Sequence, residues 1–357
     1  MADIGAALVL MLTGRMMREH TRPSSVQAVI LHCLLPATVT HAVVMSHANV
    51  NVESLYQPAL AVVFYLICAA IYHCVSLSIL LPDENHLLLI CELCSLATGL
   101  SSFPFIVLFT YQTELGKIAM MDIVNKIFGI LVVRFMLVTF GRTVGSKVSS
   151  TQRPNSTEVI SQLLHLICEP VIFATWLGSV LSWLRVSLQD LSFVGSAIYA
   201  LSQTYCTVVF IFVGLRETTS DVTALLTCTL LSRAGVGFFY VGLCTVVAPQ
   251  LLDGIDPTSS ILFFQGACSF GPYSQIRQVF NSEASPEAAR TESLALSLLT
   301  MSFPISISIL TCISLFGSGV CAPPVLLFLG ALLMVIPLFF GAWFHSCTQP
   351  PIRRILL

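Results

Sequence analysis

The feature that most restricts the fold of this chain is a succession of apolar segments, each about as long as a membrane-spanning helix. A bilayer core about 30 Å thick is crossed by roughly 20 apolar residues in helical conformation, and about eleven segments fit that window. They lie near residues 3–18, 25–47, 57–81, 86–110, 116–140, 159–184, 190–214, 221–248, 258–281, 291–316 and 323–345. Only 10% of the 357 residues are charged and the mean hydropathy is +0.89. The sequence therefore predicts an all-α polytopic membrane protein with membrane lipids around it.

The longest polar stretch, residues 141–158, predicts a cytosolic linker between two halves. Residues 1–140 form a first repeat of five helices, and residues 159–316 form a second. Because five is an odd number, the two repeats are expected to cross the membrane in opposite orientations, as in many transporters. Residues 317–357 then supply one additional transmembrane helix and a short basic tail.

Basic residues between the spans predict the orientation, because short cytosolic loops are enriched in Lys and Arg. They gather in alternate loops and in the tail, at Arg15, Arg18, Arg22, Arg142, Lys147, Arg153, Arg216, Arg290, Arg353 and Arg354. We therefore expect an N-terminus outside or in a lumen and a cytosolic C-terminus. The few charges form no basic face, so a nucleic-acid partner is not expected.

Two spans, the fourth of each predicted repeat, contain residues that interrupt a helix. The fourth span carries Gly99 and Pro104, and the ninth carries Gly271 and Pro272. Proline lacks an amide hydrogen and clashes with the preceding turn, so each helix is expected to unwind or kink within the membrane. Irregular backbone survives at this depth only inside protein or beside a wet cavity. We expect the two broken helices to cross there.

The unwound centres are the predicted substrate site, because transporters bind their substrates at discontinuous helices. The start of a half-helix favours a carboxylate through its amide groups and dipole. The alternative is a pair of packing kinks whose nearby hydroxyls only satisfy freed backbone groups. The candidate substrate-binding residues are Thr98, Gly99, Ser101, Ser102, Pro104, Gln265, Ser269, Gly271, Pro272 and Tyr273.

Asp122, Asn125 and Lys126 in the fifth span are the predicted ion-coupling residues. A carboxylate inside a membrane costs a few kcal/mol unless it is paired, hydrated or functional. Asp122 and Lys126 share one helical face, so the alternative is a structural salt bridge near the membrane surface.

Three arginines of the apolar segments are candidates for holding an anion. For each, the favoured interpretation is snorkelling to the headgroups or pairing with Glu92 or Glu169. These arginines are Arg134, Arg233 and Arg277.

Metal, cofactor and enzyme chemistry have little support in the sequence. Cys91 and Cys94 have the CxxC spacing, but no second pair or histidine cluster accompanies them, so no metal or cofactor is expected. No nucleophile, base and orienting group can be assembled from the spacing, and an enzyme is not expected. The histidines of the apolar segments, His32, His41, His73 and His165, are interpreted as packed or pore-facing polar groups.

Taken in order, a set of short motifs resembles the auxin efflux carrier family, the PIN and PIN-like proteins of the bile acid and arsenite transporter superfamily. The resemblance covers about residues 8–316. It rests on Gly14-Arg15, Leu34-Leu35-Pro36-Ala37, Thr98-Gly99 with Pro104, Asp122 with Asn125, Glu169-Pro170, Leu177-Gly178, Gly214-Leu215, Arg233, and Gln265-Gly266-Ala267 with Pro272. The resemblance implies a homodimer of carriers.

The expected function is a secondary transporter or facilitator of a small organic anion, auxin-like or another carboxylate, working by alternating access. One departure from the family supports an alternative. Leu96 and Ala97 stand where the family commonly has a Gly-Asn pair whose amide contacts substrate. The alternative is a receptor or regulator with a transporter fold that senses a sterol or another lipid, with or without transport.

The predicted topology is tested at Asn155, which lies in the sequon Asn155-Ser156-Thr157 within the linker. A cytosolic linker never meets the glycosylation machinery of the secretory pathway, so Asn155 is expected to stay unmodified in eukaryotic cells. Glycosidase treatment followed by gel migration or mass spectrometry checks this. A glycan at Asn155 would invert the predicted orientation.

Overall fold

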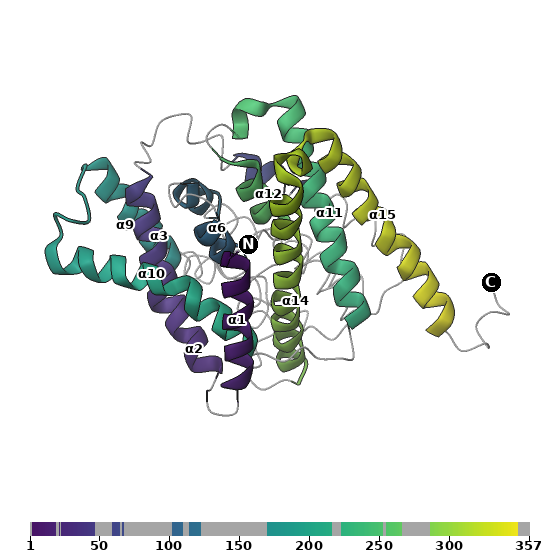
Figure 1. Cartoon of the computed structure of the whole chain (residues 1–357), viewed down its shortest axis with the longest axis horizontal. Coiled ribbons are helices and arrows are strands. Elements are labelled where there is room, and N and C mark those ends of the chain that lie inside the picture. The colour runs from purple at the N-terminus through teal and green to yellow at the C-terminus, as the bar shows by residue number, and fades with distance from the viewer. Residues whose placement is uncertain are drawn as a thin grey trace, which may run out of the picture.

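In the part of the chain that the computed structural model describes, every element of secondary structure is a helix (Figure 1). The described residues are 2–18, 21, 23–46, 59–64, 66–67, 102–109, 114–122, 170–215, 223–252, 255–265 and 286–348. The prediction of an all-α protein is therefore confirmed for these residues. The linker over 141–158 lies outside them.

The helices of the first half are α1 (Ala2–Met16), α2 (Pro23–Val29), the π-helix η1 (Ile30–Leu34), α3 (Leu35–Met45) and α6 (Phe103–Phe109), with further helical segments over 59–64, 66–67 and 114–122. Those of the second half are α9 (Pro170–Trp183), α10 (Ser192–Leu215), α11 (Thr223–Val247), the 3-10 helix η4 (Pro249–Leu252), α12 (Pro257–Gln265) and α14 (Pro286–Phe316). The 3-10 helix η5 (Gly317–Cys321) then leads into α15 (Pro323–Thr348).

Several described helices are suited to a bilayer. By length and composition, four can cross a membrane: Ser25–Met45, Ser192–Leu215, Leu230–Val247 and Ser302–Cys321. Shorter apolar helices cover Ile4–Met16, Pro170–Trp183 and Pro323–Ile336. The chain is thus an integral, multi-pass membrane protein in its described part, and the count of eleven spans stays a prediction.

Helix ends alternate between two sides of the molecule, as successive spans require (Figure 1). The turn from α1 to α2 and the starts of α11 and α14 lie at the lower edge of the picture, whereas η4 and η5 lie at the upper edge. These described helix ends lie on the sides that the predicted alternation of spans assigns to them. Which of the two sides faces the cytosol stays a prediction.

Contacts between the halves follow a reciprocal pattern. The first predicted span, α1, packs on the seventh, α10, and the second span, through α3, packs on the sixth, α9. Exchanging the two halves turns the first of these contacts into the second. The pairing of α3 with α10 and that of α6 with α12 each map onto themselves under the same exchange.

Glycines allow the closest of these approaches. A Cβ atom added at Gly14 of α1 would strike the carbonyl oxygen of Ile211, and one at Gly214 of α10 would strike that of Met11. On the other helix pair, a Cβ at Gly178 would lie 2.9 Å from the Cβ of Val43. Small residues of this kind let membrane helices approach backbone to backbone.

The last helix, α15, packs on α11 through glycines in the same way. A Cβ at Gly330 would lie 2.5 Å from the amide nitrogen of Phe239, and one at Gly235 would lie 2.8 Å from that of Met334. In Figure 1, α15 diverges from the rest of the bundle toward the C-terminus. Its attachment to the protein is thus made near its first half, against α11.

The second span is continuous but locally widened. The amide of Leu35 donates to the carbonyl of Ile30 five residues earlier, which makes the π-helix η1. Pro36 follows directly and has no amide to donate to the preceding turn. A π-turn beside a proline relieves the lost hydrogen bond without ending the helix.

The reciprocal glycine contact between α1 and α10 yields a test. Gly14→Ala should destabilise the protein by about 1–3 kcal/mol, because the methyl group is forced against a backbone carbonyl. Gly5→Ala is the matched control, since a Cβ there meets nothing within 4 Å. It should be neutral or slightly stabilising, because alanine favours a helix. Thermal unfolding in detergent measures both, and equal unfolding midpoints for the two variants would contradict the described contact.

Candidate functional site

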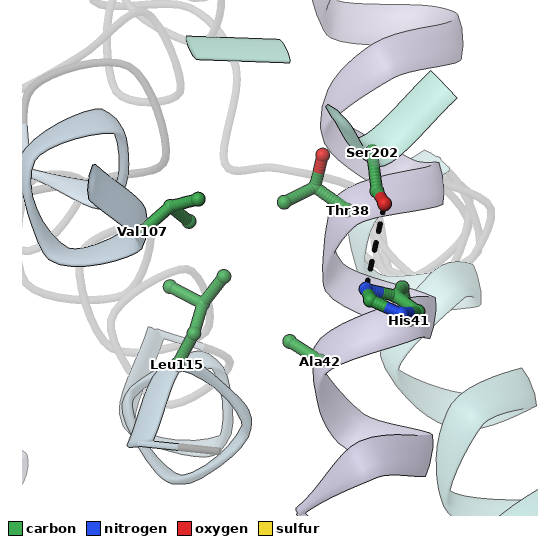
Figure 2. Close-up of a pocket in the computed structure, with 6 residues that line it drawn as sticks. All are labelled: Thr38, His41, Ala42, Val107, Leu115 and Ser202. Carbon is green, nitrogen blue, oxygen red and sulfur yellow. Dashed lines mark hydrogen bonds between the residues drawn. The ribbon is translucent and has the colours of Figure 1, made fainter. Parts of the chain in front are cut away.

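A narrow pocket lies where four helical segments meet, two from each side of an interface. Thr38, His41 and Ala42 of α3 and Ser202 of α10 form one wall. Val107 of α6 and Leu115 of the 114–122 helix form the other. Figure 2 shows these six residues, which we call the interhelix pocket. In this conformation the pocket is too tight to hold a water molecule.

The polar wall of the interhelix pocket is organised around His41. The Ser202 hydroxyl donates to the carbonyl of Tyr199 at 2.7 Å, and its oxygen lies 3.4 Å from His41 Nδ1 (Figure 2). The His41 ring also meets the Tyr199 ring edge to face, with centroids 5.4 Å apart. His41 is only 5% exposed. The imidazole therefore contacts side chains of α10 and has little contact with solvent.

The apolar wall follows directly from the first predicted helix break. α6 begins at Phe103, and the Ser102 carbonyl accepts hydrogen bonds from the amides of Phe105 and Ile106 at 3.1 and 3.0 Å. Pro104 thus lies in the first turn of a helix, where its missing amide hydrogen costs nothing. The Ser102 hydroxyl is buried and has no hydrogen-bond partner. Whether a helix precedes Ser102 lies outside the described residues.

Asp122 lies inside the protein, at the end of the described 114–122 helix. It is 1% exposed, and Tyr205 of α10 near it is also fully buried. Leu115 and Asp122 are seven residues apart, so they share one helical face with about 10 Å between them along the axis. The face that closes the interhelix pocket therefore also carries Asp122.

The structure leaves most of the predicted crossing untested. Gln265 is the last residue of α12, and its side chain lies outside the described part. The other candidates outside the described residues are Thr98, Gly99, Ser101, Asn125, Lys126, Ser269, Gly271, Pro272 and Tyr273. What is described is the contact between α6, which follows the first predicted break, and α12, which precedes the second.

Arg233 of α11 departs from the interpretation favoured by the sequence. Snorkelling is wrong for this residue, because it is 0% exposed and its guanidinium carbon lies 5.0 Å from the ring centroid of Phe64. The arginine is near the middle of a helix packed against α12, α14 and α15, too far from a helix end to reach headgroups. A cation over an aromatic face is stabilised when desolvated. Arg134 and Arg277 lie outside the described residues.

A second polar cluster joins the halves near η4. Glu114 accepts a hydrogen bond from the Ser259 hydroxyl at 2.6 Å and one from the Asp256 amide at 3.2 Å. Asp256 in turn accepts from the amide of Thr258 at 2.8 Å and so caps the start of α12. We call Glu114, Asp256 and Ser259 the Glu114 clasp. It fixes the 114–122 helix to α12.

Sequence reasoning missed Thr38, Ser202 and Glu114, and it gave His41 no specific role. Each is a single polar residue in or beside an apolar span, without a local motif. Their common signal is polarity at a position where lipid or core would favour an apolar side chain. Only the packing of helices distant in sequence brings them together.

No protein-family model matches the chain, and none of the curated proteins is significantly similar to it.

The Glu114 clasp yields a stability test. Ser259→Ala removes a buried hydroxyl that donates to a carboxylate, and such bonds contribute about 1.5–3 kcal/mol. Ser308→Ala is the control, because its exposed hydroxyl bonds only to Pro304 in its own helix, at 2.7 Å. Denaturant unfolding in detergent should show a loss for Ser259→Ala alone. Equal stability of the two variants would remove the clasp as a link between the halves.

Proposed function

We propose that the protein is a secondary transporter or facilitator of a small organic anion, auxin-like or another carboxylate. The observation that carries the proposal is the contact between α6 and α12. These helices come from different halves: α6 begins at the first predicted break, with Pro104 in its first turn, and α12 leads toward the second, which lies outside the described residues. A pair of discontinuous helices meeting in this way is how many carriers form a substrate site.

The reciprocal contacts of the helices support two inverted repeats. α1 on α10 and α3 on α9 exchange when the halves are exchanged. The glycines that permit these contacts, Gly14 and Gly178, occupy corresponding predicted spans, the first and the sixth. Inverted repeats are typical of carriers, because a pseudo-two-fold axis in the membrane plane relates a conformation open to one side to a conformation open to the other. The resemblance to the auxin efflux carriers, drawn from the order of short motifs, agrees with this architecture.

The proposed motion separates two groups of helices. One group contains α1, α3, α9 and α10, which contact one another. The other contains α12 and the 114–122 helix, joined by the Glu114 clasp, and we assign to it α6, which contacts both α12 and α10. The interhelix pocket lies on the boundary between them. Sliding of one group past the other would open the boundary and give the anion access to the broken helices.

Asp122 is the proposed ion-coupling residue. A buried carboxylate within a membrane protein is a functional site by default, because its burial is costly. Asp122 lies on the boundary, near Tyr205 of the opposite group. A relative motion of the two groups would therefore change the surroundings of Asp122. Binding of a proton or cation at Asp122 would then depend on which way the boundary is open.

The test is flux of a panel of radiolabelled carboxylates into proteoliposomes. Asp122→Asn should reduce concentrative transport at least tenfold, because the coupling charge is lost while the shape is kept. The matched control is Asp190→Asn in the loop between α9 and α10. There the hydroxyl and amide of Ser187, at 2.7 and 2.8 Å, lower the pKa of Asp190 from its usual value, so it is charged at neutral pH. Unchanged flux in Asp122→Asn would exclude this residue from the mechanism.

A receptor or regulator that senses a sterol or another lipid is the second candidate. The tightness of the interhelix pocket favours it, because a carrier at rest with an open pathway would hold water there. A photoactivatable sterol probe in nanodiscs distinguishes the two. Saturable labelling together with the absence of flux for every carboxylate would support the receptor.

A further inference from the structure

We propose that His41 is a proton-binding site whose protonation opens the boundary between the two helix groups. This proposal depends on the proposed transport function only where it predicts that acid changes the flux of an anion. Opening of the interhelix pocket with acid is a property of the protein itself. It assigns a role to a buried histidine that the broken-helix mechanism does not use.

The contacts of Ser202 are compatible with one neutral tautomer of His41 in the closed pocket. Ser202 has one hydroxyl proton, and the 2.7 Å distance to the Tyr199 carbonyl shows where it is donated. Ser202 Oγ can then only accept from His41 Nδ1, which lies 3.4 Å away. In the neutral tautomer that makes this contact the proton is on Nδ1, and Nε2 has a lone pair that can take up a second proton.

Among the described residues, no carboxylate forms an ion pair with His41. α9 and α6 contain no titratable side chain. In the described part, α10 carries Tyr199, whose ring meets His41 edge to face, and the buried Tyr205 and Cys206, and the 114–122 helix carries the buried Asp122. Asp122 lies two turns from Leu115, the residue that closes the pocket. Glu114 on that helix is engaged with α12, and Lys117 is on another face.

Charge in such a place destabilises the closed pocket. Val107 and Leu115 form the opposite, apolar wall of the pocket (Figure 2), so in the closed pocket a protonated His41 ring would lie beside apolar groups and be 5% exposed. Separating the walls admits water to the ring and removes this cost. Protonation thus shifts the balance toward the open boundary. With one proton linked, the ratio of open to closed molecules rises by at most about tenfold per pH unit.

The pocket is positioned to sense one side of the membrane. A Cβ at Gly116, next to Leu115, would lie 2.8 Å from the carbonyl oxygen of Ala42 and would strike Ser46, the residue after α3. The Glu114 clasp lies just beyond, next to η4. This end of the bundle is the one that the sequence places outside or in a lumen. Acid on that side is expected to open the boundary.

Hydrogen exchange of the whole protein in nanodiscs tests the proposal without any substrate. After correction for the intrinsic pH dependence of exchange, amides of α6 and of the 114–122 helix should lose protection at least threefold between pH 7.5 and 5.5. His41→Gln, which keeps a polar side chain without a titratable ring, should abolish the change. His32→Gln is the matched control, because His32 lies on the same span but is exposed; it should behave like the unaltered protein.

A second measurement keeps the proposal testable if His41→Gln does not fold. Exchange at the ring carbon of each histidine, followed by mass spectrometry of the unaltered protein, should be several-fold slower at His41 than at His32 at pH 7.5. The difference should narrow as the pH falls and the pocket opens. A pH response that persists in His41→Gln, or that His32→Gln abolishes, overturns the proposal. If amide protection falls with acid but the protein transports none of the carboxylates, the proposed transport function is contradicted and the proton site at His41 is retained.

Discussion

Helices in a bilayer are not drawn together by the hydrophobic effect, because lipid tails are as apolar as the side chains they would replace. Association then depends on how closely two backbones can approach. Among the described helix pairs that join the halves, the approach is closest where α1 meets α10, at Gly14 and Gly214, and it recurs where α9 meets α3, at Gly178. These contacts join spans from different halves. The rest of the arrangement, including the interhelix pocket, depends on that joining because α3 and α10 supply its polar wall.

The polar groups inside the bundle are stabilised in different ways. Thr38 and Thr175 donate to carbonyls of their own helices, at 2.8 Å each, so they add little to the contacts between helices. Thr40 instead donates to the Ala174 carbonyl at 3.2 Å and links α3 to α9. Tyr240 donates to the Leu60 carbonyl at 2.7 Å and carries a ring that packs on Phe64. A hydrogen bond between helices fixes their register, whereas one within a helix does not.

Much of the helical framework could be predicted from the sequence, because apolar length and loop charge are local properties. α10, α11 and the helix from Ser25 to Met45 fall within predicted spans. The start of α6 near Pro104 was also foreseeable, since proline belongs in a first turn. The interhelix pocket could not be predicted, because its residues come from four segments between positions 38 and 202 and no single segment contains a motif. The burial of Arg233 over Phe64 was missed for the same reason: the aromatic partner is far away in the chain.

The attachment of α15 to α11 makes the two halves unequal. Gly235 and Gly330 bring these two helices into backbone contact, and the described helices of the first half include no counterpart of α15. A displacement of α11 would therefore move α15 with it. Because this helix contacts only one side of the molecule's internal symmetry, the two orientations that exact symmetry would make equal in free energy become unequal, and one is preferred in the absence of any ligand.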